Sequence, residues 1–168
     1  MLMPEKFNTP ERSAIMARVR SKGTGPEMRV RRALFARGLR YRLHTKGLPG
    51  SPDLVLKKYK SVIFVHGCFW HWHGCRRSRM PATNVDYWNA KIKRNQDRDY
   101  SNILDLLALG WRVLIVWECA LIPSLVEKTA DVIAKWLSES QQQARCDIIS
   151  PDISATGNAT PTLRPHQI

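Results

Sequence analysis

The segment from Phe64 to Cys75 constrains the fold more than any other part of the chain. Its sequence, FVHGCFWHWHGC, brings three histidines, two cysteines and several large aromatic rings into twelve residues. Thiolate and imidazole are ligands that zinc prefers in a tetrahedral site. Aromatic rings can stack on bases or insert between them. We therefore expect a zinc-stabilised loop that contacts nucleic acid and carries a catalytic histidine.

The charge of the chain indicates a polyanionic partner. Its 168 residues include 27 Lys and Arg but only 14 Asp and Glu, which gives a net charge of +13 and a sequence pI of about 10.1. Nucleic acid is the first candidate for such a protein, and an anionic membrane surface is the second. A basic surface without a partner is the alternative.

The sequence also indicates a compartment. It holds no run of eighteen apolar residues, and Met1–Lys6 lacks the apolar core of a signal peptide. We therefore expect a cytoplasmic protein. The four cysteines are then candidates for metal or thiol chemistry before disulfides.

Hydrophobic periodicity and turn residues divide the chain into one domain with two arms. We expect a flexible N-terminal arm over 1–12, a domain over 13–140 and a disordered, polar tail over 141–168. Helices are predicted at 9–20, 24–37, 84–110 and 123–139, and strands at 40–45, 53–56, 61–65 and 111–117. The second helix should place Met28, Leu34 and Phe35 inward and Arg29, Arg31 and Arg32 outward. This order predicts an α/β fold, a small mixed sheet with helices packed on it.

Cysteines and histidines from two segments can complete a zinc site. Cys68 and Cys75 belong to the ligand-rich loop, and Cys119 follows the apolar strand that ends at Trp117. With one histidine of the loop they would supply the four ligands of a structural site. The alternative for Cys119 is a buried core thiol. Cys146 lies in the polar tail and is not included.

Asp53 is a candidate ligand for a catalytic metal. It starts a predicted strand, and the strand 61–65 follows at hairpin distance and leads to His66. Phosphodiester cleavage uses a carboxylate at Mg²⁺, which also binds waters and phosphate oxygens. The alternative is an aspartate that only begins a strand. A neutral imidazole is suited to take a proton from the attacking water.

Three segments resemble the very short patch repair (Vsr) endonuclease family: PGSPD at Pro49–Asp53, VIFVHGCFWH at Val62–His71 and GWRVLIVWECAL at Gly110–Leu121. The resemblance covers about Ser13 to Leu121. It implies a restriction-endonuclease-like core and an Mg²⁺-dependent endonuclease, with two catalytic Mg²⁺ ions and one structural Zn²⁺. The implied reaction nicks one DNA strand next to the T of a T:G mismatch that arises from deaminated 5-methylcytosine. We expect a monomer whose partner is double-stranded DNA, with mismatch-repair proteins as candidate partners.

The resemblance also implies roles for individual residues. It gives Asp53 as the metal-binding aspartate, His71 as the histidine that activates water, and His66, Glu27 and Asp99 as further catalytic-site residues. The implied zinc ligands are Cys68, His73, Cys75 and Cys119. The family often has threonine where this chain has Val65, and that residue offers its backbone carbonyl to Mg²⁺, which a valine can also do.

DNA contacts are expected from aromatic and basic side chains. The resemblance implies that Phe69, Trp70 and Trp88 insert into DNA beside the mismatch, where imperfect pairing lowers the cost of unstacking. Lys91, Lys93 and Arg94 on the long helix are candidates for phosphate contacts. The alternatives are a core role for Trp88 and a solvated face for the charges.

Two other functions are weighed against the nicking enzyme. A zinc-stabilised DNA-binding module would need Asp53 only for folding. A restriction-type nuclease would cut both strands of fully paired DNA. A zinc deaminase is disfavoured because the chain has no His-x-Glu followed by Pro-Cys-x-x-Cys.

Overall fold

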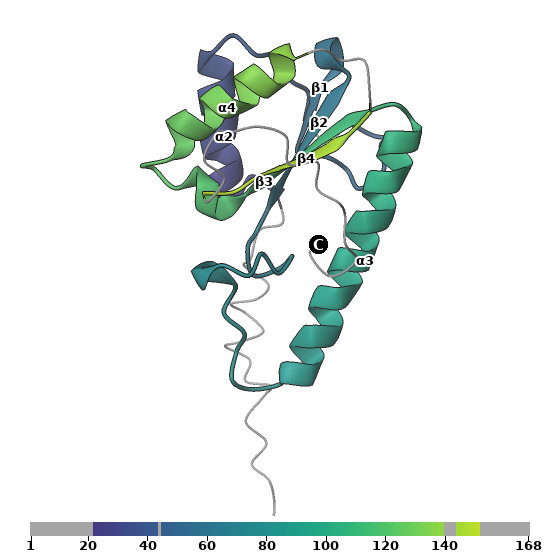
Figure 1. The fold of residues 1–168 in the computed structure, drawn as a ribbon, viewed down its shortest axis with the longest axis vertical. Helices are drawn as coiled ribbons and strands as arrows, with labels where there is room; N and C mark the ends of the chain where they lie inside the picture. Colours follow the sequence, from purple (N-terminus) through teal and green to yellow (C-terminus); the bar gives the residue numbers. More distant parts are fainter. Residues whose placement is uncertain (1–21, 44, 140–143, 152–168) are drawn as a thin grey trace, which may run out of the picture.

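A four-stranded sheet between two layers of helices organises the molecule (Figure 1). The computed structural model describes residues 22–43, 45–139 and 144–151. In chain order the elements are α2 (Gly25–Ala36), β1 (Leu54–Leu56), β2 (Ser61–His66), α3 (Val85–Ala108), β3 (Arg112–Trp117), α4 (Val126–Ser138) and β4 (Cys146–Ile149), with short 3₁₀ turns at Lys57–Tyr59, Arg76–Ser78 and Glu118–Leu121. The N-terminal arm and the helix predicted at 9–20 lie outside the described residues.

The sheet is mixed, as the sequence predicts. Its strand order is β1-β2-β3-β4, with β1 antiparallel to β2 and the other pairs parallel. The β2–β3 register runs from Ser61 opposite Arg112 to His66 opposite Trp117. The two strands therefore end level with each other, and the segments that follow them leave the sheet at the same edge.

Helices cover both faces of the sheet, and alternate strand residues contact each layer. Leu114 and Val116 of β3 belong to a core cluster with α2 and α4, whereas Val113 and Ile115 belong to a cluster with α3. Figure 1 shows α2 and α4 on one side of the strands and α3 on the other. Burial on both faces explains why β2 and β3 are continuous apolar runs. None of the described helices is both long and apolar enough to cross a membrane.

Helix α2 begins at the predicted capping box. The Thr24 hydroxyl accepts the Glu27 N–H at 3.4 Å, and the Glu27 carboxylate accepts the Thr24 N–H at 3.2 Å. The prediction that Arg31 points outward is wrong, because its guanidinium is buried against Glu27. A buried arginine is tolerated where a carboxylate pairs with it.

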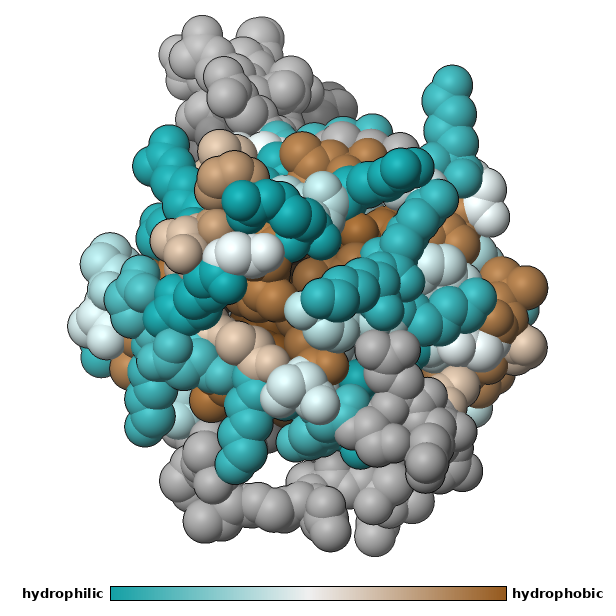
Figure 2. Space-filling view, turned by 90° about the horizontal axis from the view of Figure 1, so that it is seen from above, coloured by the Kyte–Doolittle hydropathy of each residue, from teal (hydrophilic) through white to brown (hydrophobic). Residues whose placement is uncertain are grey.

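The prediction that Phe35 faces inward is also wrong, since 56% of the side chain is exposed. The Arg40 guanidinium lies over this ring, 4.1 Å from its centroid. The cation covers one ring face and favours it electrostatically, so the exposed position is stabilised. Figure 2, seen from above the view of Figure 1, shows long hydrophilic side chains beside apolar surface on this face of the molecule.

The predicted strand 40–45 is reduced to a single bridge between Arg42 and Val55. The two residues exchange backbone hydrogen bonds of 2.9 Å. β1 is only three residues long, and Val55 is its middle residue. β1 is bounded by a bend at Asp53 and by a 3₁₀ turn that begins at Lys57. The pairing between Arg42 and Val55 therefore has little strand on the β1 side along which to extend.

The prediction of a disordered tail is wrong for residues 144–151. β4 pairs with β3 in parallel, and Cys146 is buried opposite Val113. Asp147 fixes the strand to α4, because its carboxylate accepts the Trp136 indole N–H at 2.7 Å. The polar composition of 141–168 gave no signal of a strand, because β4 forms only by pairing with β3. Residues 152–168 lie outside the described part of the chain.

Shortening the chain tests the role of β4. A chain that ends after Gln143 should be less stable than one that ends after Pro151 by roughly 2–4 kcal/mol, because it loses the β3–β4 ladder and the burial of Cys146. Urea unfolding of both chains measures the difference. Equal free energies of unfolding would contradict the contribution of β4, and the longer chain controls for truncation itself.

Candidate active site and metal centre

The candidate site lies where β2 and β3 end and the β2–α3 loop begins. His66 is the last residue of β2 and faces Trp117, the last residue of β3. The loop and the N-terminal half of α3 extend beyond the sheet (Figure 1). In open α/β sheets, sites form at the carboxyl ends of parallel strands. This edge therefore collects the residues that the sequence singles out.

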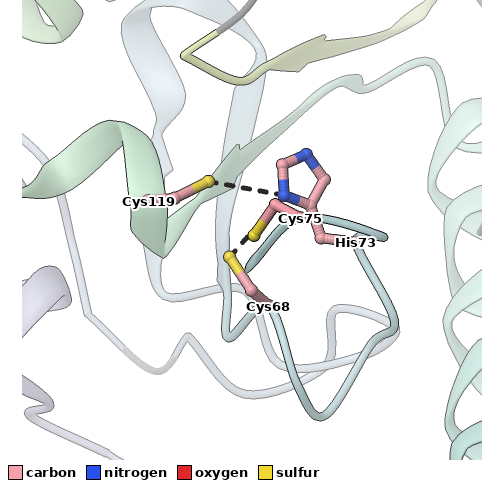
Figure 3. Close-up of side chains that lie close together, drawn as sticks. All are labelled: Cys68, His73, Cys75 and Cys119. Atoms are coloured by element: carbon pink, nitrogen blue, oxygen red, sulfur yellow. Dashed lines mark hydrogen bonds between the residues drawn. The ribbon is translucent and has the colours of Figure 1, made fainter. Parts of the chain in front are cut away.

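Four soft ligands meet beside this edge (Figure 3). The ligand atoms of Cys68, His73, Cys75 and Cys119 lie within 4.8 Å of one another. His73 Nδ1 is 3.7 Å from Cys68 Sγ and 3.4 Å from Cys119 Sγ. In a tetrahedral zinc site with Zn–S bonds of about 2.3 Å, ligand atoms are about 3.7 Å apart. The set and its spacing fit a closed, structural zinc site.

The protonation of the thiols depends on burial. Burial raises the pKa of Cys68 and of Cys119. Burial alone would also raise the pKa of Cys75, but hydrogen bonds led by the Arg77 N–H lower it below its ordinary value. Thiolates at such positions need a cation, and a bound metal supplies it. Cys146 differs, because burial raises its pKa to about 12 away from this cluster.

A second cluster joins two histidines and an aspartate. His66 and His71 stack with ring centroids 3.9 Å apart and planes 11° apart. His71 Nδ1 is hydrogen-bonded to the carboxylate of Asp99, which α3 supplies. Phe64, His66, Asp99, Asn102 and Ile103 line a cavity of about 10 Å³ beside them, which has room for about one water molecule.

The charges of this cluster follow from burial and pairing. Burial, with a smaller contribution from the neighbouring His71, lowers the pKa of His66 to about 3, so His66 is neutral at physiological pH. Burial alone would raise the pKa of Asp99, but the hydrogen bond from His71 lowers it below its ordinary value. Asp99 is therefore an ionised carboxylate that accepts the Nδ1–H of His71.

Asp53 lies next to this cluster along the sheet. Its carboxylate accepts the Val65 backbone N–H at 2.7 Å, at the residue just before His66. Oxygen donors from a carboxylate and a nearby backbone carbonyl are the type that Mg²⁺ binds. Glu27 is arranged differently, since its carboxylate accepts hydrogen bonds from Gly23 and Thr24 and pairs with Arg31. The structure gives Glu27 a helix-capping role, and its catalytic role stays a prediction.

Aromatic side chains gather where the loop meets α3. The rings of Phe69, Trp70 and Trp88 contact one another with centroids 5.1–6.1 Å apart. The Lys91 ammonium lies 5.4 Å from the Trp70 ring centroid and 5.8 Å from that of Trp88. The structure thus brings together the three rings that the sequence analysis grouped, with one of the predicted basic residues over them.

The other predicted basic residues lie on the exposed surface of α3. Lys93 pairs with Asp97 at 2.7 Å, and Arg94 is exposed beside it. The ion pair is solvated and contributes little to stability, so Lys93 can exchange it for a phosphate. Both side chains stay candidates for DNA contacts.

Several residues that hold the site were not predicted. Asn95 donates to the Trp70 carbonyl at 3.0 Å, and Gln96 donates to the His71 carbonyl at 3.5 Å. Asn95 lies on the helical stripe that runs through Trp88, Ile92 and Ile103, where a polar residue interrupts apolar positions. That interruption is the signal that could have identified Asn95. The Tyr87 ring, 5.2 Å from Trp88, extends the aromatic cluster without such a signal.

Comparison with known proteins decides the family. The model of the family described as DNA mismatch endonuclease Vsr matches residues 4–77. Type II nicking enzyme V.NmeAIP of Neisseria meningitidis is 46% identical over 119 residues, which cover 71% of this chain and 85% of the relative. Type II nicking enzyme V.XorIIP of Xanthomonas oryzae is 48% identical, covering 71% and 88%. DNA mismatch endonuclease Vsr of Escherichia coli is 44% identical, covering 71% and 76%.

The chain belongs to the Vsr family of DNA mismatch endonucleases. Membership in the Vsr family makes it a DNA endonuclease of the hydrolase class. The mixed sheet with flanking helices is consistent with the restriction-endonuclease-like fold expected from the resemblance. The Vsr family also implies a divalent metal in the reaction.

The ionised Asp99 predicts a pH dependence of stability. A carboxylate whose pKa is lower in the folded than in the unfolded chain stabilises the fold above its ordinary pKa, 3.8 here, and this contribution disappears as the pH falls through the folded pKa. The free energy of unfolding of the wild type should exceed that of Asp99→Asn near neutral pH, and the difference should shrink below pH 3.8.

Urea unfolding of both proteins at a series of pH values measures this difference. Asp105→Asn is the control, because it removes an exposed carboxylate of the same helix. A wild-type advantage over Asp99→Asn that stays constant from neutral to acid pH would show that the Asp99 charge does not stabilise the site.

Proposed function

We propose that this protein nicks one DNA strand next to the T of a T:G mismatch and so starts very short patch repair. The proposal rests on one observation above all, the His71–Asp99 hydrogen bond at the end of β2, with Asp53 bound to the adjoining Val65 backbone. A base, its supporting carboxylate and a candidate metal ligand are the parts that phosphodiester hydrolysis needs. The names of the relatives, mismatch endonuclease and nicking enzymes, support the same reaction.

His71 acts as the general base in this proposal. Because Asp99 accepts the Nδ1–H, the Nε2 of a neutral His71 carries the lone pair. Nε2 takes a proton from water as the water oxygen bonds to phosphorus and an ester oxygen of the phosphodiester leaves. Asp99 then stabilises the imidazolium that forms. His66 stacks on the base and fixes its plane as a neutral ring.

Asp53 and the Val65 backbone carbonyl would hold the catalytic Mg²⁺, for which two ions are proposed. Bound Mg²⁺ would offset the charge that grows on the phosphate oxygens. The hydrogen bond from the Val65 N–H to Asp53 fixes the carboxylate beside the strand end. Replacing the family's usual threonine by Val65 leaves the backbone carbonyl in place.

Mismatch selection is assigned to the aromatic cluster. Phe69, Trp70 and Trp88 are in mutual contact and half-buried, so part of each ring faces solvent at the projecting end of the molecule. Insertion of rings between base pairs costs less where pairing is imperfect. The net charge of +13, with Lys91, Lys93 and Arg94 on α3, supplies attraction to the DNA backbone.

The cellular setting is proposed from the same chemistry. A monomer suffices to cut one strand, whereas a restriction-type enzyme that cuts both strands needs two active sites. Mismatch-repair proteins are candidate partners downstream of the nick. The DNA substrate and the bacterial relatives favour the cytoplasm.

A nicking assay tests the function. Purified protein and Mg²⁺ should nick a duplex with one T:G mismatch, in a set of flanking sequences, beside the mismatched T and on that strand alone. His71→Ala should lower the rate by about a hundredfold or more, because a general base contributes roughly 10²–10⁴. Asp53→Ala should lower it at least as much, because it removes the carboxylate that would hold Mg²⁺. Asp105→Ala, an exposed aspartate of α3, is the matched control.

Two results would count against this function. Cleavage of both strands of fully paired DNA would favour a restriction-type enzyme. Nicking that survives in His71→Ala at the wild-type rate would remove His71 from the mechanism, whatever the substrate.

We also propose that the Cys68, His73, Cys75 and Cys119 cluster binds one structural Zn²⁺. Zinc in a closed site contributes to folding. Cys119→Ser should lose the metal and unfold at a lower urea concentration. Cys146→Ser is the matched control, because the two cysteines are 8% and 7% exposed but only Cys119 lies in the cluster.

Elemental analysis of desalted protein measures the zinc content. The wild type and Cys146→Ser should each hold about one zinc per chain. Full zinc content in Cys119→Ser, or none in the wild type purified with zinc present, would overturn the assignment.

A further inference from the structure

A continuous series of ring contacts connects the zinc-ligand cluster (Cys68, His73, Cys75 and Cys119) with the histidine pair, His66 and His71. The His73 ring stacks on Trp117 with centroids 4.4 Å apart and planes 21° apart. The Trp117 ring meets His66 edge to face at 5.5 Å and 72°. His66 in turn stacks on His71 at 3.9 Å. Trp117 is therefore the single side chain in this series that contacts a ring of each cluster.

The backbone fixes Trp117 at this junction. It ends β3 directly opposite His66, and Cys119 follows it by two residues. Its side chain is 4% exposed, so its position is set by packing rather than by solvent. The indole has little freedom to move unless His73 or His66 moves with it.

The geometry of the Trp117 contacts indicates that this side chain positions its neighbours and does not only fill the core. The nearly parallel faces of His73 and Trp117 hold the plane of the indole, and the T-shaped contact of the indole with His66 then limits rotation of the His66 ring. The stack of His66 on His71 passes this constraint to the proposed base. A core residue that only filled volume would not need a flat ring in contact with both histidines.

We propose that Trp117 is a positioning residue that couples the zinc-bound His73 to the orientation of His66 and, through it, of His71. The inference rests on the proposed nicking function. Trp117 itself does not touch the substrate or the reacting water. Its role predicts a loss of rate after DNA is bound, while zinc content and DNA affinity stay unchanged, because misplaced catalytic groups slow the chemical step.

Substitution of Trp117 tests the proposal. Trp117→Leu keeps an apolar side chain but removes the ring, whereas Trp117→Phe keeps a ring that can meet both histidines. In single-turnover nicking of a T:G duplex, Trp117→Leu should be slower by about tenfold to a hundredfold, and Trp117→Phe should stay within about threefold of the wild type. The dissociation constant for the same duplex, measured with Ca²⁺ in place of Mg²⁺, should change less than about threefold in both variants.

The same strand supplies a matched control. Trp111 precedes the first residue of β3, is 9% exposed and lies at the opposite end of the strand from the site. Trp111→Leu should lower stability but leave the single-turnover rate within about threefold of the wild type. Equal rate losses in Trp111→Leu and Trp117→Leu would show a general packing effect and overturn the proposal.

His73→Cys tests the other end of the series. Four cysteines also form a structural zinc site, so this variant can keep the metal while it removes the ring that stacks on Trp117. The proposal expects zinc content near the wild type and a nicking rate lowered by about tenfold. A wild-type rate in zinc-loaded His73→Cys would show that the metal, and not the ring series, positions the histidines.

The outcomes separate this inference from the function on which it rests. If the wild type nicks no T:G duplex, the proposed function fails and no rate comparison is drawn. If the wild type nicks and Trp117→Leu nicks equally fast, only the positioning role fails. Should Trp117→Leu not fold, as judged by circular dichroism, His73→Cys and Trp117→Phe still decide the point, since a wild-type rate in the first overturns it.

Discussion

The parallel pairing of β2 with β3 is the constraint on which the rest of the site depends. It places His66 opposite Trp117 at the last paired position. Cys68 and Cys119 each follow these residues by two positions, so both thiols leave the sheet at the same level. Because both strands are buried on both faces, a slip of one residue would move each side chain to the other core layer, disrupt its packing and separate the thiols. The hydrophobic core thus sets the geometry of the metal ligands.

The two buried groups of the histidine cluster carry no unpaired charge. His66 remains neutral, and Asp99 keeps its charge through the hydrogen bond with His71. The thiols of the zinc-ligand cluster are the exception, since burial opposes their ionisation. A bound cation would reverse that effect, so in the proposed zinc site the cluster contributes to folding only with the metal bound.

The sequence predicted the elements that carry their own pattern. The apolar runs of β2 and β3, the capping box before α2 and the ligand-rich loop were found where the structure has them. Features that depend on one specific side-chain partner were not predicted. Arg31 points inward because Glu27 pairs with it, and Phe35 can face outward because Arg40 covers its ring. Composition alone could not show either contact.

Tertiary pairing also explains the other differences. β4 lies in a polar segment, and its strand exists because β3 offers an open edge. Within the site, the residues indicated three cysteines with one histidine of the loop, the resemblance gave His73 as that histidine, and the structure brings the four together. From the sequence, Trp117 was only the last apolar residue of a predicted buried strand. Its contacts with His73 and His66 appear only when the two strands are placed side by side.

Helix α3 connects mismatch sensing with chemistry in the proposed function. Its first turns carry Trp88 and Lys91, and Asp99 lies two to three turns further along the same rigid element. Asn95 lies between them and donates a hydrogen bond to the Trp70 carbonyl, so the helix also holds the loop that follows β2. An α-helix resists bending over so few turns, so Trp88 and Asp99 keep a fixed separation on α3. In the proposed function, a Trp88 ring placed in DNA would therefore also fix the position of the carboxylate that orients His71.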